Sequence, residues 1–94
     1  MTVKHYYRVV CDREAEMAGA GLGHEEIYGD GPRFFWNLHS ARERCSDLNR
    51  FGSDDLRDTY SVEAGGVYSD GSWDDSDNSY AREQLELPRR LVGM

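Results

Sequence analysis

"TVKHYYRVVC", residues 2–11, predicts the strand around which the fold is built. Successive side chains of a strand point to opposite faces of a sheet, and both sets here include aromatic or branched residues. The two faces would hold Val3, Tyr7, Val9 and Cys11 on one side, and Lys4, Tyr6, Arg8 and Val10 on the other. We therefore expect an inner strand that is covered on both faces.

The strongest helix signal is "SARERCSDLNRF", residues 40–51. Its apolar residues recur at the i, i+4 and i+7 spacing of one helical face: Ala41, Cys45 and Leu48. Ser40, with Glu43 three residues later, has the form of a capping box. The pattern predicts one main helix, about residues 41–51, packed on one face of the sheet.

Two glycine-containing segments predict hairpins. Gly29–Gly31 would form a turn between a strand that ends at Tyr28 and a second strand that follows Pro32. Gly65-Gly66 would turn a strand over 58–64 into a short edge strand at 67–69, through which two copies could pair. We expect an α+β fold with a small antiparallel sheet of three to five strands, as a monomer or a homodimer.

The length of 94 residues is that of one domain, 1–94. Within it we expect a glycine-broken loop at 12–23 that is weakly helical at its start, an acidic loop at 69–79 and a loosely held tail at 88–94, after two helical turns at 79–86. The expected core consists of Tyr7, Val9, Phe34, Trp36, Leu38, Cys45, Leu48 and Val62.

The net charge is −7, from 11 basic and 18 acidic residues, and it is concentrated in one segment. Residues 53–77 hold Arg57 against eight carboxylates. Binding to nucleic acid or to an anionic membrane needs a basic surface, so the charge argues against both. It suits a protein that meets a basic partner.

One motif in the acidic segment suggests a metal. A twelve-residue calcium loop that starts at Asp75 would place oxygen ligands at Asp77, Ser79 and Glu86. Tyr80, however, stands where the sharp turn of such a loop needs glycine. A calcium-binding module centred on Asp75, Asp77 and Glu86 is therefore kept as the alternative function.

The remaining chemistry is sparse. Cys11 and Cys45 are the only cysteines, and no histidine stands at a spacing that indicates zinc binding or a nucleophilic thiol. We expect no enzyme activity, no cofactor and no metal. The N-terminal residues lack an apolar leader, which predicts a cytoplasmic protein with reduced thiols and no membrane association.

Recognition is the function class that remains. Aromatic side chains among charges are common at protein-binding surfaces, where they supply desolvated anchors. Trp73 would either serve as such an anchor or fold back onto the small core, and the sequence leaves both open. The candidate partner-binding residues are Asp54, Asp55, Asp58, Tyr68, Asp70, Trp73, Asp74, Asp75, Asp77 and Tyr80.

Four general features occur together: the size, ten arginines against one lysine, a lone α+β domain and the run "DGSWDDSDNSY" at residues 70–80. In this combination the chain resembles the small acidic accessory proteins of double-stranded DNA bacteriophages that infect GC-rich hosts. Proteins of that kind often bind and inhibit one host protein, and some mimic the charge of DNA. The resemblance implies a host protein with a basic surface as the partner, met in the host cytoplasm.

Overall fold

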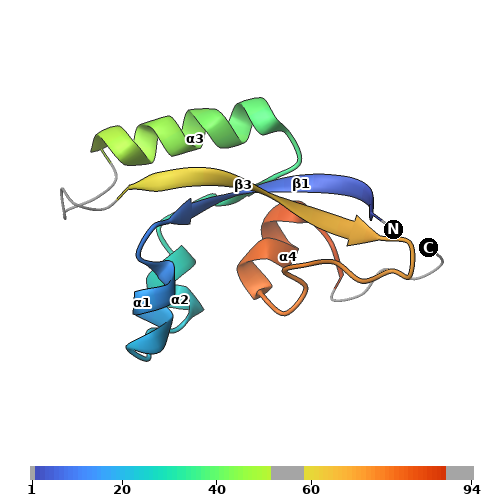
Figure 1. Cartoon of the computed structure of the whole chain (residues 1–94), viewed down its shortest axis with the longest axis horizontal. Coiled ribbons are helices and arrows are strands. Elements are labelled where there is room, and N and C mark those ends of the chain that lie inside the picture. Colours follow the sequence, from blue (N-terminus) through green and yellow to red (C-terminus); the bar gives the residue numbers. More distant parts are fainter. Residues whose placement is uncertain (1, 52–58, 89–94) are drawn as a thin grey trace.

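The computed structural model describes residues 2–51 and 59–88, and these form an α+β fold around a three-stranded antiparallel sheet. The strand order is β2-β1-β3, so β1 is the inner strand, as its alternation predicts. Helix α3 lies along one face of the sheet and α4 lies against the other, with α1 and α2 beside it (Figure 1). The elements are β1 Thr2–Cys11, α1 Glu14–Gly19, α2 His24–Tyr28, β2 Phe34–Phe35, α3 Leu38–Phe51, β3 Tyr60–Tyr68 and α4 Ser79–Leu85.

The face beneath α3 carries the first core cluster. Val9, Ala41 and Leu48 are buried there, and the cluster is completed by half-buried Tyr7, Phe35, Cys45, Tyr60 and Val62. The predicted helix is confirmed, but the predicted cap is wrong. Asn37 caps α3, because its Oδ1 accepts the N–H groups of His39 at 2.7 Å and Ser40 at 3.4 Å. Glu43 instead lies 2.9 Å from the His39 imidazole on the outer face.

The face beneath α4 carries the second cluster, which is centred on Tyr6. The Tyr6 ring is fully buried and makes edge contacts with Trp36 and Trp73, at centroid distances of 6.1 and 5.8 Å. The cluster also contains Phe34, Val67, Ala81 and Leu85. Of the expected core, Val9, Phe34 and Leu48 are buried, whereas Tyr7, Trp36, Leu38, Cys45 and Val62 are half-buried.

Strand β3 runs straight through Gly65-Gly66, so the hairpin predicted there is wrong. Gly65 packs on Tyr6, and a Cβ at residue 65 would lie 2.6 Å from the Tyr6 hydroxyl oxygen. Glycine is therefore needed for a close approach inside a strand and not for a turn. The chain reverses at 69–72 instead, where the Tyr68 N–H donates to the Ser72 carbonyl at 2.8 Å. Trp73 then pairs with Val67 in an isolated bridge, which covers the edge expected to stay open at 67–69.

Between β1 and β2, the helical start and the glycine-broken end expected for residues 12–23 are both present, whereas the strand expected to end at Tyr28 is a helix. Residues 14–19 form α1, and Ile27 and Tyr28, which we expected to end a strand, belong to α2. Arg33, only 2% exposed, connects this segment to β1, because its guanidinium donates to Asp30 and to the carbonyls of Val9 and Ile27. These bonds hold the segment beneath β1.

The C-terminal helix is close to its predicted bounds, with Asn78 Oδ1 as its cap, 2.9 Å from the Tyr80 N–H. The tail expected at 88–94 lies outside the described residues from residue 89 onwards. No helix in the described part of the chain has both the length and the apolar character that a membrane span requires.

Candidate functional site

Two carboxylates of the acidic loop accept hydrogen bonds from the loop itself and from the end of β3. Asp74 accepts the Gly66 N–H at 2.7 Å and the Tyr68 hydroxyl at 2.5 Å. Asp70 accepts the Ser72 N–H at 3.0 Å and the Ser72 hydroxyl at 2.5 Å. The hydrogen bond from Tyr68 to Asp74 raises the pKa of that phenol. These two aspartates hold the turn that follows β3.

Asp75 points away from that turn and under the sheet. Its Oδ2 accepts the Tyr6 hydroxyl at 2.5 Å and Arg8 Nη1 at 2.8 Å, and its own N–H donates to the Tyr6 oxygen at 2.9 Å. Burial, together with the bond to Asp75, raises the pKa of Tyr6 far above its usual range. Asp75 therefore anchors the loop to the core.

The other candidate residues do not form one surface with these aspartates. Trp73 is 3% exposed and its indole N–H donates to the Pro88 carbonyl at 3.0 Å, so of the two roles left open for Trp73 the structure shows packing in the core and not a surface anchor. Tyr80 is half-buried and donates its hydroxyl to Glu25, and Asp77 is exposed. The predicted residues Asp54, Asp55 and Asp58 lie outside the described residues.

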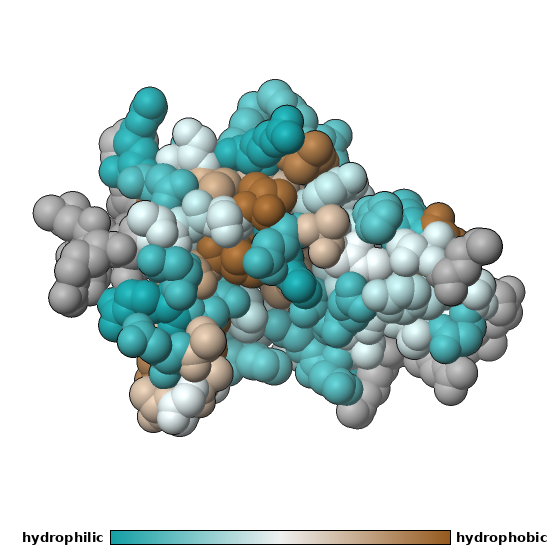
Figure 2. Space-filling model, viewed as in Figure 1, coloured by the Kyte–Doolittle hydropathy of each residue, from teal (hydrophilic) through white to brown (hydrophobic). Residues whose placement is uncertain are grey.

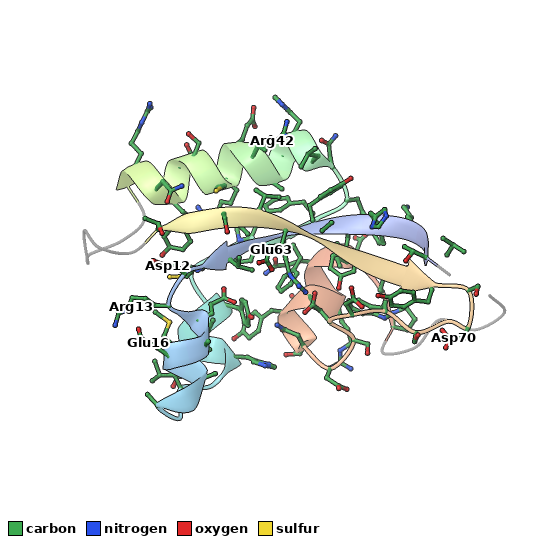
Figure 3. The ribbon with its side chains drawn as sticks, in the orientation of Figure 1. Asp12, Arg13, Glu16, Arg42, Glu63 and Asp70 are labelled. Carbon is green, nitrogen blue, oxygen red and sulfur yellow. The ribbon has the colours of Figure 1, made fainter. Side chains whose placement is uncertain are left out.

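A different arrangement of charge lies beneath β1 and β3. A cleft of about 390 Å³ opens between the α1–α2 pair and the loop that carries Asp75. In Figure 3, Glu63 lies under the crossing of β1 and β3, and Asp12 lies near the start of α1. The residues that line the cleft are Arg8, Val10, Cys11, Asp12, Glu14, Ala15, Tyr28, Ser61, Glu63 and Asp75. Four carboxylates and one guanidinium give it a formal charge of −3.

The carboxylates of the cleft differ in how far they are engaged. The Glu14 side chain is 18% exposed, accepts the Cys11 N–H at 3.1 Å and lies 3.5 Å from buried Arg33. The Asp75 side chain, 20% exposed, is held by Arg8. The Glu63 side chain is 54% exposed, and its contact with Arg8 Nε is longer, at 3.4 Å. Of these three carboxylates, Glu63 is therefore the most available to an incoming cation.

Two further groups define the chemistry of the cleft. The N–H of Thr59 donates to Asp12 and lowers the pKa of that exposed carboxyl, so Asp12 keeps its charge to lower pH. Burial and the adjacent charge of Glu14 raise the pKa of Tyr28 to about 12. Tyr28 thus keeps its proton at neutral pH and offers a hydrogen bond rather than proton transfer.

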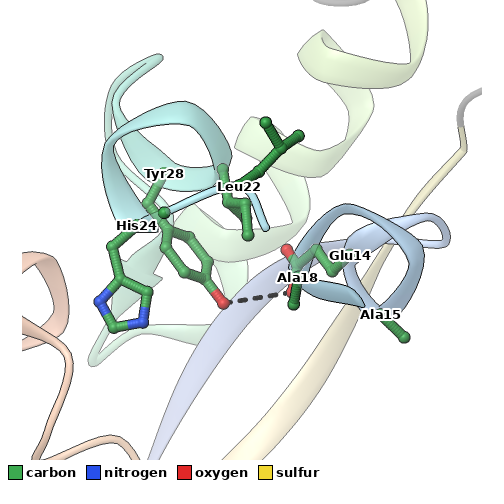
Figure 4. A pocket seen from close by; sticks show the side chains of 8 residues that line it. Glu14, Ala15, Ala18, Leu22, His24 and Tyr28 are labelled. Atoms are coloured by element: carbon green, nitrogen blue, oxygen red, sulfur yellow. Dashed lines mark hydrogen bonds between the residues drawn. The ribbon is translucent and has the colours of Figure 1, made fainter. Parts of the chain in front are cut away.

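A second hollow, of about 600 Å³, adjoins the cleft between α1 and α2. Glu14 and Tyr28 line both spaces, and the Tyr28 hydroxyl donates to Glu14 Oε2 at 3.2 Å (Figure 4). The rest of this lining is mainly apolar and includes Leu22, which is 43% exposed. The hollow could take an apolar side chain next to a charged one in the cleft.

The calcium alternative lacks its loop. Residues 79–85 form α4, Asp75 is bonded to Tyr6 and Arg8, and Glu86 has a left-handed conformation with φ 58° at the end of the helix. Within residues 2–51 and 59–88, no group of three or more His, Cys, Asp or Glu side chains is placed to hold a metal ion.

Comparisons with known protein families, with curated proteins and with solved structures found no match for this chain. The cleft therefore has to be interpreted from its own residues. Sequence reasoning placed Arg8 on a strand face and Glu63 in the acidic segment, but it missed the site they form with Asp12, Glu14 and Tyr28. Four of these residues come from four separate elements and Asp12 comes from the turn between β1 and α1, so no single local pattern in the sequence relates them.

Proposed function

We propose that this protein is a non-enzymatic binding module that takes a positively charged segment of a partner protein into the acid-lined cleft. The observation that carries the proposal is the set of four carboxylates around one guanidinium in that cleft. Following the resemblance to phage accessory proteins, the proposed partner is a host protein, and the proposed effect of binding is inhibition.

The contacts of the cleft favour a cationic guest. Two of its carboxylates, Asp12 and Glu63, are on exposed residues, and Tyr28 adds a phenol at the cleft wall. An arginine or lysine side chain that entered beside Glu63 would gain a carboxylate whose contact with Arg8 is long. The net charge of −7 would also speed the encounter with a basic partner at low ionic strength.

The internal bonds of the acidic loop bear on how binding would occur. A mimic of DNA needs carboxylates that point outward, as the phosphates of a duplex do. Asp74 and Asp75 instead accept hydrogen bonds from Gly66, Tyr68, Tyr6 and Arg8 of the same chain. This favours binding in the cleft over a surface that mimics nucleic acid.

The test uses a synthetic seven-residue peptide, acetylated and amidated at its ends, in which arginine alternates with threonine. Titration calorimetry at low and moderate salt should show binding that weakens steeply with salt. The double variant Asp12→Asn, Glu63→Gln should lower the affinity about tenfold, which is about 1.4 kcal/mol.

The matched control is the double variant Asp47→Asn, Glu83→Gln, which removes the same charge from exposed positions on α3 and α4 outside the cleft. It should change the affinity by less than about twofold, since only long-range attraction is reduced. Equal losses in the two double variants would mean that net charge alone drives binding, and the cleft proposal would then be wrong.

A further inference from the structure

The outer edge of β3 carries backbone groups that point away from the sheet. The Val9 N–H donates to the Arg33 carbonyl at 2.8 Å on the β2 side, so the neighbouring residues of β1 direct their backbone toward β3. Arg8 pairs there with Glu63, and Val10 pairs with Ser61. By the alternation of an antiparallel ladder, the outward-facing residues are Tyr60, Val62, Ala64 and Gly66.

Both ends of this row are closed by the chain itself. At one end, the Asn49 side chain accepts the Tyr60 N–H at 2.7 Å and donates to the Tyr60 carbonyl at 3.1 Å. At the other end, Asp74 accepts the Gly66 N–H at 2.7 Å through its side chain and donates its own N–H to the Gly66 carbonyl at 3.1 Å. In both cases a single residue satisfies the donor and the acceptor together.

Between these two closures the row is open. Among the described residues, the outward N–H and C=O groups of Val62 and Ala64 have no hydrogen-bond partner. Edge strands of soluble proteins are usually protected by proline, lysine, a bulge or a covering segment. The stretch from Val62 to Ala64 contains neither proline nor lysine. It also contains no bulge, because β3 keeps a regular register with β1 along it.

We propose, on the basis of the function proposed above, that an extended basic segment of the partner pairs with β3 at Val62–Ala64 and adds a fourth strand to the sheet. Peptides commonly bind exposed sheet edges in this way, with affinity from the backbone and specificity from alternate side chains. The four open groups of Val62 and Ala64 supply the backbone hydrogen bonds.

The two faces of β3 define the side chains that the added strand carries. Ser61 and Glu63 line the acidic cleft, so the residues of the partner on that face are arginine or lysine. Val62 and Ala64 lie on the α3 face, opposite Val9 and Tyr7. Figure 2, which views the layers from the side with α3 at the top, shows hydrophobic residues in the middle of the view below α3. Small or β-branched side chains fit there. The recognised pattern alternates basic residues with small or branched ones.

A second copy of the chain fits this edge less well. Two copies that paired antiparallel about Glu63 would place Glu63 directly opposite Glu63 of the other copy, and like charges at that position destabilise a sheet. Each copy would also bring a net charge of −7. The charge of the cleft therefore favours a basic partner strand over self-association.

The experiment uses the alternating arginine–threonine peptide and the variant Ala64→Pro. Proline removes the outward N–H of residue 64 but leaves the bonds to β1 intact, because Ala64 faces away from β1. The affinity of Ala64→Pro should fall at least tenfold, whereas Ala64→Val keeps the donor and should lose no more than about twofold. Thermal unfolding followed by tryptophan fluorescence verifies that Ala64→Pro is folded.

A second measurement needs no variant. When the unsubstituted protein is saturated with the peptide, the amide protons of Val62 and Ala64 should exchange with solvent at least tenfold more slowly, because they become hydrogen-bonded. If these amides exchange as fast as in the free protein, or if Ala64→Pro binds as tightly as the unsubstituted chain, edge pairing is wrong. The proposed function then still stands, provided that Asp12→Asn, Glu63→Gln weakens binding.

Two other outcomes would also overturn the proposal. If the peptide does not bind the unsubstituted protein at all, both the edge pairing and the proposed function are overturned. If sedimentation shows a dimer that Ala64→Pro dissociates, the edge belongs to a second copy and the proposal of a basic partner strand is wrong.

Discussion

Replacing Gly65 with alanine tests the packing of Tyr6, the residue at the centre of the core cluster beneath α4. The new Cβ would lie 2.6 Å from the Tyr6 hydroxyl oxygen and 2.5 Å from Cε2, about 1 Å closer than an ordinary van der Waals contact. The ring has no free direction in which to move, because Tyr6 is fully buried between Trp36 and Trp73.

The magnitude follows from three contributions. Overpacking of a core costs about 1–3 kcal/mol. Displacement of the Tyr6 hydroxyl from Asp75 costs about 1–3 kcal/mol more, because a buried polar group loses its partner. Replacing glycine with alanine returns about 0.4–1 kcal/mol through the lower entropy of the unfolded chain. We expect a net loss of about 3 kcal/mol, or a fall in Tm of roughly 12–24 °C for a domain of this length.

Gly66→Ala is the matched control. Its Cβ would meet the ring of Tyr68 at 3.1 Å, which is a longer approach than that of Gly65 to Tyr6, and the Tyr68 side chain is only half-buried. The stability should change by no more than about 1 kcal/mol. Thermal and urea unfolding, followed by circular dichroism and tryptophan fluorescence, compares the two variants. If their stabilities agree to within about 1 kcal/mol, the close approach of Gly65 to Tyr6 does not constrain the fold and the reasoning fails.

Three further predictions concern the polar groups under the sheet. Asp75→Ala removes the acceptor of Tyr6 and Arg8 and should lower the free energy of unfolding by about 1–3 kcal/mol in urea titrations, whereas Asp75→Asn keeps an acceptor and should cost less. The pKa of Tyr28 is raised to about 12, so the folded state holds that proton more tightly than the unfolded state. The resulting stabilisation is complete below about pH 10 and is lost as the pH rises toward 12. Between about pH 10 and 12, Tyr28→Phe should therefore lose less stability than the unsubstituted chain. Identical pH profiles of stability for the two proteins would contradict the raised pKa of Tyr28. Arg33→Met leaves Asp30 and two carbonyls without their buried donor and should cost about 3–5 kcal/mol, and a change in the urea midpoint too small to measure would show that Arg33 does not hold the α1–α2 segment.

The sequence predicts the parts of the fold whose signal is local. The spacing of Ala41, Cys45 and Leu48 identifies α3, because each turn of a helix reports which face is buried. The alternation of residues 2–11 likewise identifies an inner strand. In each case a short window contains all the information that the element needs.

The failures have non-local causes. Gly-Gly has the same appearance in a tight turn and beneath a buried ring, and only the position of Tyr6, 59 residues earlier, distinguishes the two at Gly65. Ile27 belongs to α2, and its carbonyl accepts a hydrogen bond from buried Arg33, a contact that no local pattern in the sequence indicates. Trp73 lies in the core because Tyr6 and the Pro88 carbonyl receive it.

The sequence predicts the negative charge of the candidate site but not its position in the fold. Acidic character and Asp75 were anticipated from the sequence, and Asp75 does line the cleft. The carboxylates of Asp12, Glu14 and Glu63 converge there only because β1 and β3 pair and α1 folds beneath them. Asp70 and Asp74, which look equivalent to Asp75 in the sequence, are used in the turn instead.

The order of the strands along the chain also determines when β1 can pair with β3 during synthesis on the ribosome. The central strand β1 is made first, yet its main partner β3 ends at Tyr68, which pairs with Thr2. Until β3 has left the exit tunnel, β1 has only the two residues of β2 beside it, and Tyr6 lacks Gly65 and Trp73. Pairing over such a separation folds slowly and leaves an apolar strand exposed to the cell in the meantime. The nascent chain should therefore bind general chaperones most strongly before residue 68 emerges, and release them once the sheet closes.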